Sequence, residues 1–169
     1  MNIKLNYIHL SNFKGIKDFK LNADGKNVSV FGNNGTGKTT LQDAWTWLLF
    51  DKDSNNNADT KFTIKPQDKF GQDINHLQTV VEAELLVDGK PLKLKKMREE
   101  NWVTRRGTTE PVMDGHVKKY WFNEVPVKAK EYQSKVGELV NENIFKMITD
   151  PLYFNTKLSW QDRRQMLLK

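Results

Sequence analysis

The feature that most constrains this chain is a glycine-rich run that lies between a strand pattern and a helix pattern. Residues 32–39 read Gly-Asn-Asn-Gly-Thr-Gly-Lys-Thr and match the phosphate-binding pattern G-x-x-x-x-G-K-[ST] at every fixed position. Residues 27–31 before the run are mostly apolar, and residues 41–49 after it repeat apolar side chains at helical spacing. A strand, a glycine-rich turn and a helix in this order predict a P-loop.

The residue types in this run suit a chain of phosphates. Glycines let the backbone curl so that its N–H groups point inward, and the start of a helix near Lys38 adds partial positive charge. We expect Lys38 to reach the β- and γ-phosphates of ATP and the Thr39 hydroxyl to bind Mg²⁺. The motif residues expected to bind nucleotide are Gly32, Asn33, Asn34, Gly35, Thr36, Gly37, Lys38 and Thr39.

Hydrophobic periodicity elsewhere predicts both strands and helices. Alternating apolar residues predict strands at residues 3–11, 16–22, 78–87, 92–98 and 117–125. Helical spacing predicts helices at residues 128–142, at residues 144–149 and from Trp160 onward. The polar residues 51–60 and the glycine-containing residues 101–115 are predicted to be loops.

Local signals and the order of these elements define the expected fold class. Asp88-Gly89 lies between two strand patterns and is typical of a tight hairpin. Ser159, with Asp162 three residues later, resembles a capping box and predicts a final helix from residue 160 to residue 169. We expect an α/β P-loop NTPase in which a mostly antiparallel β portion, from residues 1–30 and 78–125, lies against a small parallel core.

Composition narrows the environment and the partners. The formal net charge of +6 favours a polyanionic partner, above all nucleic acid. The chain has no cysteine, no signal peptide and no apolar stretch long enough for a membrane span. We therefore expect a cytoplasmic protein that makes no use of a membrane.

The chain shows no acidic strand of the kind that hydrolysis requires. Such a strand is hydrophobic and ends in an aspartate for Mg²⁺, usually followed by a glutamate that activates water. Asp88, after Leu85-Leu86-Val87, is followed by glycine and is better explained as a hairpin turn. Asp150 is preceded by threonine and followed by proline. We therefore predict a phosphate-binding loop without its hydrolytic half, and we assign no catalytic residue from the sequence.

Several stretches together form a recognisable set. They are Tyr7-Ile-His-Leu-Ser-Asn-Phe-Lys-Gly-Ile16, Val30-Phe-Gly-Asn-Asn-Gly-Thr-Gly-Lys-Thr-Thr-Leu41, Asp43-Ala44-Trp45 and Leu49-Phe50. This set resembles the N-terminal lobe of SMC-like ATPases, and in particular the SbcC-type DNA double-strand-break repair ATPases and their phage relatives. Residues 123–168, with Asn123-Glu-Val-Pro-Val127 and Trp160-Gln-Asp-Arg-Arg164, resemble the phage-type members.

The resemblance implies a split architecture and a set of partners. In this family an N-terminal lobe carries the P-loop, a long coiled coil follows, and a C-terminal lobe supplies the acidic strand and the signature motif. Residues 1–169 would form the N-terminal lobe, with the final helix leading toward the coiled coil. The implied partners are the C-terminal lobe of the same protein, a second head in an ATP-dependent dimer, double-stranded DNA and a nuclease subunit. The implied setting is a bacterial or phage-infected cell.

The resemblance also assigns two further residues. It places Thr40 among the residues that bind phosphate and Mg²⁺, and it places Lys14, after Asn12-Phe13, at a basic position that approaches the nucleotide. One departure is that no glutamine stands clearly at the metal- and water-sensing position of the family, because Gln161 falls inside the expected final helix.

Two other functions remain open at this point. One is a self-sufficient small P-loop kinase or NTPase, and the other is a non-catalytic ATP- or DNA-binding module. One predicted strand is rich in basic residues and is therefore a candidate for contact with DNA. These residues are Lys90, Lys93, Lys95, Lys96 and Arg98. Together with Arg105-Arg106 this strand either contacts a DNA backbone or forms a solvated edge strand whose lysines discourage aggregation.

Overall fold

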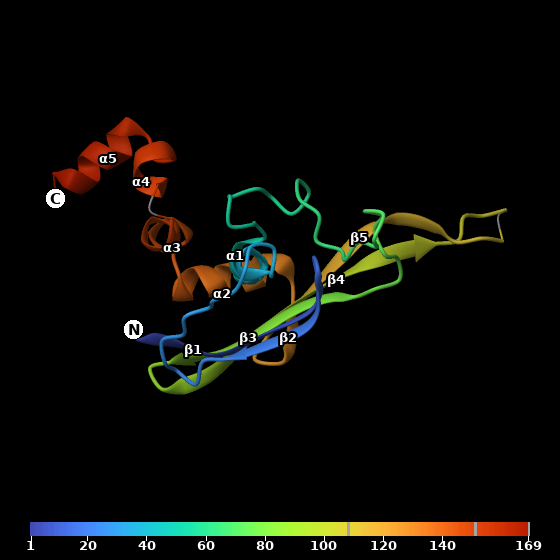
Figure 1. The fold of residues 1–169 in the computed structure, drawn as a ribbon, viewed down its shortest axis with the longest axis horizontal. Coiled ribbons are helices and arrows are strands. Elements are labelled where there is room, and N and C mark those ends of the chain that lie inside the picture. The colour runs from blue at the N-terminus through green and yellow to red at the C-terminus, as the bar shows by residue number, and fades with distance from the viewer. Residues whose placement is uncertain (108, 151, 169) are drawn as a thin grey trace. The chain divides into compact units, whose positions relative to one another are not determined.

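Six strands pair into one sheet in the order β2-β1-β3-β4-β5-β6, and every pair of neighbours is antiparallel (Figure 1). The computed structural model describes residues 1–107, 109–150 and 152–168. The strands are β1 (Ile3–Phe13), β2 (Ile16–Asn22), β3 (Thr79–Val87), β4 (Lys90–Val103), β5 (Val112–Phe122) and β6 (Val125–Val127). The chain divides into two compact units, Met1–Tyr132 and Gln133–Lys169, and the sheet belongs to the first.

Side-chain alternation gives the sheet one apolar face, which we call the inner face. Its buried residues are Ile8, Leu10, Val81, Ala83, Leu85 and Leu94. Residues between them in the strands, such as Tyr7, Glu82 and Lys95, point to the opposite side, which we call the outer face. In β1 a register shift between Leu5 and Tyr7 interrupts the alternation, so that Ile8 and Leu10, and not Tyr7, lie on the inner face.

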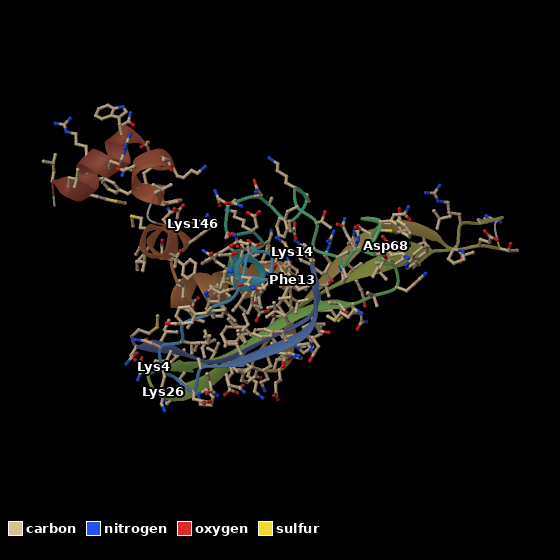
Figure 2. The ribbon with its side chains drawn as sticks, in the orientation of Figure 1. Lys4, Phe13, Lys14, Lys26, Asp68 and Lys146 are labelled. Carbon is tan, nitrogen blue, oxygen red and sulfur yellow. The ribbon has the colours of Figure 1, made fainter. Side chains whose placement is uncertain are left out.

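Helix α1 (Lys38–Phe50) packs on β1, β3 and β4 and covers the inner face. Its residues Ala44, Trp47 and Leu48 are fully buried. The ring of Phe13, at the end of β1, lies 5.6 Å from that of Trp47 and contributes to the same core (Figure 2). This packing fixes the helix whose first turn carries the predicted P-loop lysine.

A buried lysine joins the C-terminal end of α1 to the sheet. Lys96 of β4 is fully buried, and its ammonium donates to the Trp47 carbonyl at 2.5 Å and pairs with Asp51 Oδ1 at 3.2 Å. The rings of Trp47, Tyr120 and Tyr132 surround it at 5.2, 5.3 and 5.4 Å. A cation at the C-terminal end of a helix is favourable because it complements the helix dipole.

The remaining helices are α2 (Ala129–Leu139), α3 (Glu142–Thr149), α4 (Tyr153–Thr156) and α5 (Trp160–Leu167). Asn141 caps α3, and Ser159 caps α5 by accepting the Asp162 N–H at 3.2 Å, as the capping-box pattern predicted. The predicted final helix is confirmed up to Leu167, whereas its expected last residue, 169, lies outside the described residues. No helix in the described part of the chain is long and apolar enough to cross a bilayer.

Two sequence predictions about the sheet were wrong. The loop expected at residues 101–115 is much shorter, because β4 continues to Val103 and β5 begins at Val112. Asp114-Gly115, at the end of this expected loop, lies inside β5 at a β-bulge, where Gly115 has a φ of 86°. The small parallel core is not found among the described residues, since all their strand pairs are antiparallel.

Candidate nucleotide-binding site

The glycine-rich run forms a turn that opens directly into α1. Gly35 and Gly37 have φ values of 81° and 93°, which a residue with a Cβ adopts only with strain. Gly32 is constrained by space, because a Cβ there would meet Thr36 Oγ1 at 2.6 Å. The three glycines of the motif are thus each required by the local geometry, as expected for a loop that curls around phosphates.

The charge around this turn suits an anion. The Lys38 ammonium folds back over the turn and donates to the carbonyls of Gly32 and Asn33, both at 2.7 Å. The first turn of α1 contains no acidic residue, and Gly37 caps the helix without any side-chain hydrogen bond. The first N–H groups of α1 therefore keep their partial positive charge for a ligand.

Thr39 and Thr40 follow Lys38 in the first turn of α1, and Thr39 is exposed. No hydrogen bond engages the Thr39 hydroxyl within the described residues, so it is free to act as a ligand for a metal. No cluster of three His, Cys, Asp or Glu side chains suited to a metal occurs in the described ranges. Mg²⁺ bound here would depend on Thr39 and on phosphate oxygens, which is a common arrangement for this ion.

The segment before the turn was predicted to be a buried strand, and this was wrong. Residues 27–31 form no strand, and Val28, Val30 and Phe31 are 44%, 43% and 90% exposed. A strand needs a neighbour for its backbone hydrogen bonds, and no described residue pairs with this segment. A largely apolar segment without described backbone partners therefore leads into the P-loop.

An apolar hollow of about 300 Å³ lies beside this segment and α1. It is lined by Leu5, Ile8, Leu21, Val30, Lys38, Leu41, Gln42 and Trp45. Trp47 is fully buried, whereas Trp45 is only half-buried and faces this hollow. One side of α1 is thus packed on the sheet, and another presents apolar side chains without a described partner.

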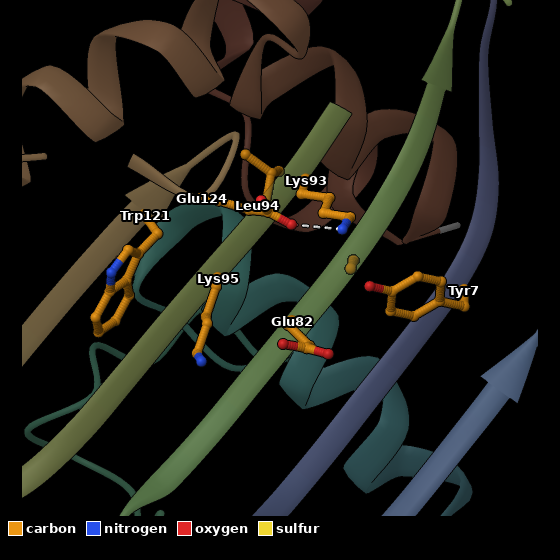
Figure 3. A pocket seen from close by; sticks show the side chains of 8 residues that line it. Tyr7, Glu82, Lys93, Leu94, Lys95, Trp121 and Glu124 are labelled. Atoms are coloured by element: carbon orange, nitrogen blue, oxygen red, sulfur yellow. Dashed lines mark hydrogen bonds and ion pairs between the residues drawn. The ribbon is translucent and has the colours of Figure 1, made fainter. Parts of the chain in front are cut away.

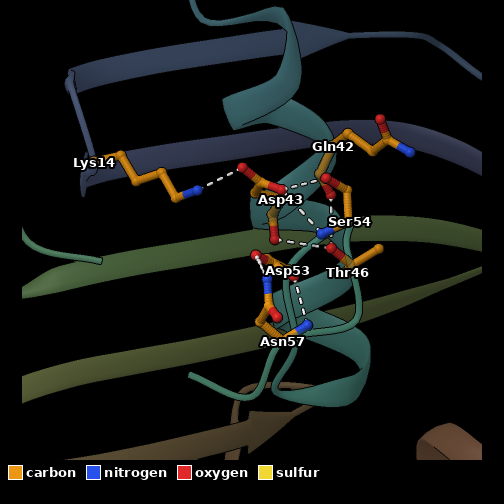
Figure 4. Close-up of polar contacts among 7 residues, drawn as sticks. All are labelled: Lys14, Gln42, Asp43, Thr46, Asp53, Ser54 and Asn57. Atoms are coloured by element: carbon orange, nitrogen blue, oxygen red, sulfur yellow. Dashed lines mark hydrogen bonds and ion pairs between the residues drawn. The ribbon is translucent and has the colours of Figure 1, made fainter. Parts of the chain in front are cut away.

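Lys14 lies in the tight turn between β1 and β2, and its ammonium contacts α1 (Figure 2). It donates to Asp43 Oδ2 at 2.5 Å, while Asp43 Oδ1 accepts the backbone N–H and hydroxyl of Ser54 at 2.9 and 2.6 Å (Figure 4). Its predicted approach to the nucleotide stays a prediction. Asp43 was not predicted to be a site residue. It lies four residues after Thr39, however, and this spacing puts both residues on one face of α1.

The two aspartates rejected as acidic-strand residues each accept a backbone N–H, Asp88 from the distant Asn2 and Asp150 from the nearby Leu152. Asp88, between β3 and β4, accepts the Asn2 N–H at 2.7 Å. Asp150 caps the C-terminal end of α3 and accepts the Leu152 N–H at 2.9 Å. The described geometry therefore supports the interpretation of Asp88 as a hairpin residue and gives Asp150 an equally local role.

The basic strand of the sequence analysis is β4. The structure contradicts part of both interpretations of it, namely a strand that contacts DNA and a solvated edge strand. It is an internal strand rather than an edge, and Lys96 is buried and out of reach of DNA. On the outer face Lys93 pairs with Glu124 at 2.6 Å, and Lys95 lies over the Trp121 ring at 5.3 Å (Figure 3). Glu82 lies beside these residues, in a hollow of the outer face that Lys93, Lys95 and Glu124 also line. Acidic partners thus interrupt the basic stripe that the sequence suggested.

A profile of the AAA domain family matches residues 7–162. The chain belongs to the AAA domain family. The match includes the P-loop turn and α1, so the geometry described above lies within the region that defines this AAA domain. A comparison with curated proteins gives no match.

Solved structures show the same fold at low identity. A structure from work on ATP-driven dimerisation and DNA-stimulated activation of SMC ATPases has a TM-score of 0.60 at 16% identity and covers 97% of each chain. An Smc head domain with a coiled coil and joint from Pyrococcus yayanosii has a TM-score of 0.52 at 16% identity, over 79% of this chain and 25% of that one. The recombination mediator RecF with ATP has a TM-score of 0.51 at 16% identity, over 98% and 37%.

These matches confirm the fold class predicted for this AAA domain, an α/β P-loop ATPase head with a large antiparallel portion. They also confirm the resemblance to SMC-like ATPases at the level of the fold, while the phage origin stays a prediction. The chain spans about a quarter of the Pyrococcus chain and little more than a third of RecF.

Proposed function

We propose that this AAA domain is the ATP-binding N-terminal lobe of an SMC/SbcC-like ATPase that acts in DNA double-strand-break repair or recombination. One observation carries the proposal. A turn with two left-handed glycines opens directly into α1, and the Lys38 ammonium rests on carbonyls of that turn at 2.7 Å. Backbone N–H groups, a helix N-terminus and one mobile cation together are the donors that bind polyphosphates.

The residues fit Mg-ATP. Residues 32–38 would hold the β- and γ-phosphates, and Thr39, next to Thr40, would bind Mg²⁺. Mg²⁺ supplies charge neutralisation on the phosphate oxygens when it is bound. The part of this chain is to bind and orient the phosphates, because the two aspartates that most resemble an acidic strand, Asp88 and Asp150, lie at a hairpin and at a helix end, where each accepts a backbone N–H.

An unpaired backbone segment and an apolar hollow support the proposal that a second lobe is required. Residues 27–31 have no described backbone partner, and the apolar hollow beside them is lined by Leu41 and Trp45 of α1. A strand laid against this segment would satisfy its N–H and C=O groups, and apolar side chains from the same lobe would fill the hollow. We assign this surface to the C-terminal lobe of the same protein, which would add the acidic strand.

The test of the proposed function is Mg-ATP binding and turnover by the 169-residue chain, alone and with the C-terminal lobe added in trans. We expect binding by calorimetry with negligible turnover for the chain alone, and turnover after the lobe is added. AMP is the matched ligand control, because it lacks the phosphates that the loop would hold. Equal affinity for AMP and ATP would contradict the assignment of residues 32–39, and full turnover by the chain alone would contradict the need for a second lobe.

Phe31→Asp should weaken association with the C-terminal lobe by roughly 30-fold, which is the loss typical of an apolar anchor in an interface. The side chain is 90% exposed, so its loss should leave the unfolding of the isolated chain unchanged. Phe70→Asp is the matched control, because Phe70 is 77% exposed but lies in the loop before β3. Surface plasmon resonance measures the affinity of each variant for the C-terminal lobe. Equal affinities for the two variants would remove residues 27–31 from the interface.

The role in DNA repair or recombination rests on two supports. Its neighbours in fold include a recombination mediator and SMC ATPases studied for DNA-stimulated activation, and the chain carries a net charge of +6. Double-stranded DNA and a second head are therefore part of the proposal, and a nuclease subunit is a further expectation. The DNA surface is not the outer face of β4 alone, because Glu82 and Glu124 lie among its lysines.

A further inference from the structure

Asp43 is held by two separate elements on the flank of α1 (Figure 4). Lys14, from the turn between β1 and β2, donates to Oδ2 at 2.5 Å, and Ser54, from the loop after α1, donates twice to Oδ1. The side chain of Asp43 is 6% exposed and that of Lys14 is 25% exposed. The carboxylate is therefore enclosed, whereas the Lys14 side chain is partly exposed to solvent.

The backbone that carries Lys14 is fixed independently of this ion pair. The Lys14 N–H donates to the Ile64 carbonyl at 2.7 Å, and the Asn12 carbonyl accepts the Thr79 hydroxyl at 2.9 Å. Ile16 packs against the P-loop, with its Cδ1 at 3.4 Å from the position of a Cβ on Gly37. The Lys14 ammonium also lies 4.9 Å from the centre of the Phe62 ring. Because the backbone bonds do not involve the side chain, departure of the ammonium from Asp43 would require rotation of the four-carbon stem alone.

The predicted phosphate and metal position is within reach of that rotation. Thr39 and Asp43 are four residues apart, so they lie on one face of α1 and about 6 Å apart along its axis. A phosphate chain bound at the first turn of α1 carries several negative charges, and it competes with a single carboxylate for the same cation.

We propose that Asp43 is a positioning residue that holds Lys14 in the nucleotide-free state and releases it to the phosphates of bound ATP, so that Asp43 sets the nucleotide affinity. The proposal rests on the ATP-binding function proposed above. The release leaves Asp43 with the two Ser54 donors, and its Oδ1 stays hydrogen-bonded. Part of the free energy of ATP binding is used to break the contact between Lys14 and Asp43. The apparent affinity for ATP is therefore lower than it would be without that contact.

The test is a double-mutant cycle on Mg-ATP affinity with Asp43→Asn and Lys14→Met. Asparagine keeps the oxygen that accepts from Ser54 but loses the charge that holds Lys14. Asp43→Asn should therefore tighten Mg-ATP binding, by roughly three- to tenfold for a coupling of this size. In the Lys14→Met background the gain should vanish. A purely structural role for Asp43 predicts the opposite, namely a loss of affinity that is similar in both backgrounds.

A measurement on the unaltered chain guards against a misfolded Asp43→Asn variant. The ¹⁵N signal of the Lys14 ammonium, assigned through Lys14→Arg, should shift when Mg-ATP saturates the chain and should stay in place with Mg-AMP. A signal that does not respond to Mg-ATP overturns the release of Lys14. If the chain binds no Mg-ATP at all, the proposed function fails. If it binds Mg-ATP but Asp43→Asn brings no gain that depends on Lys14, only the inference on Asp43 fails.

Discussion

Lys38→Ala is expected to weaken Mg-ATP binding by roughly 30- to 100-fold. The ammonium already lies over the P-loop turn, where it donates to the carbonyls of Gly32 and Asn33 at 2.7 Å. A charge-assisted hydrogen bond contributes about 1.5–3 kcal/mol, and roughly each 1.4 kcal/mol changes affinity tenfold. The helix N-terminus and the glycine backbone remain, so residual binding should persist. Isothermal titration calorimetry with Mg-ATP measures the change.

Lys26→Ala is the matched control for the Lys38 experiment, because Lys26 is an exposed lysine shortly before the motif. It removes the same charge from the same region, so it separates a specific contact from general attraction of an anion. Binding of AMP should differ little between the two variants, since AMP lacks the phosphates that Lys38 would reach. Equal losses of Mg-ATP affinity in the two variants would show that net charge, rather than the P-loop, drives binding.

Local signals in the sequence predicted the parts of the fold that depend on local physics. The start of α1 at Lys38, the hairpin at Asp88-Gly89 and the cap at Ser159 were each correct, since turns and caps are decided within a few residues. The strand expected at residues 27–31 was wrong for the complementary reason. Its apolar pattern is real, but a strand exists only beside another strand, and no described segment supplies one.

The candidate site shows the same division. The motif glycines could be predicted, because the left-handed conformations of Gly35 and Gly37 and the close approach of Thr36 to Gly32 all favour a residue without a Cβ. The contact of Lys14 with Asp43 joins residues far apart in the chain, so no spacing rule indicated it. Lys96 could have been recognised as a core residue, because it shares the parity of Leu92 and Leu94 in β4, but its charge suggested a surface instead.

Asp51→Asn is expected to lower the free energy of unfolding by about 3 kcal/mol at pH 7, which is the cost of leaving a buried charge without its partner. The charge left behind is the Lys96 ammonium, which is fully buried and 3.2 Å from Asp51. Burial lowers the pKa of Lys96 to about 8. Burial also acts to raise the pKa of Asp51, but Lys96 and Lys118 together hold it below its usual value. Urea unfolding followed by tryptophan fluorescence measures the loss.

The lowered pKa of Lys96 determines whether its contribution to the free energy of unfolding rises or falls with pH. Since the folded state releases the Lys96 proton near pH 8 and the unfolded chain near 10.5, stability rises with pH between those values. The attraction to Asp51 needs the charged ammonium, so the effect of Asp51→Asn should shrink from pH 7 to pH 10. The folded state raises the pKa values of Lys118, Tyr120 and Tyr132, so the stability that these groups contribute falls as the unfolded chain loses their protons near pH 10. The comparison of Asp51→Asn with the unaltered chain at each pH separates the Lys96 effect from theirs.

The Lys96→Met background isolates the contribution of this pair, since methionine fills a similar space without a charge. There the effect of Asp51→Asn should fall to what its contact with Lys118, at 3.2 Å, contributes. It should also lose its dependence on pH. An effect of equal size at pH 7 and pH 10, or in both backgrounds, would mean that Lys96 does not carry a buried charge at neutral pH. The C-terminal end of α1 would then be held to the sheet by packing and by neutral hydrogen bonds alone.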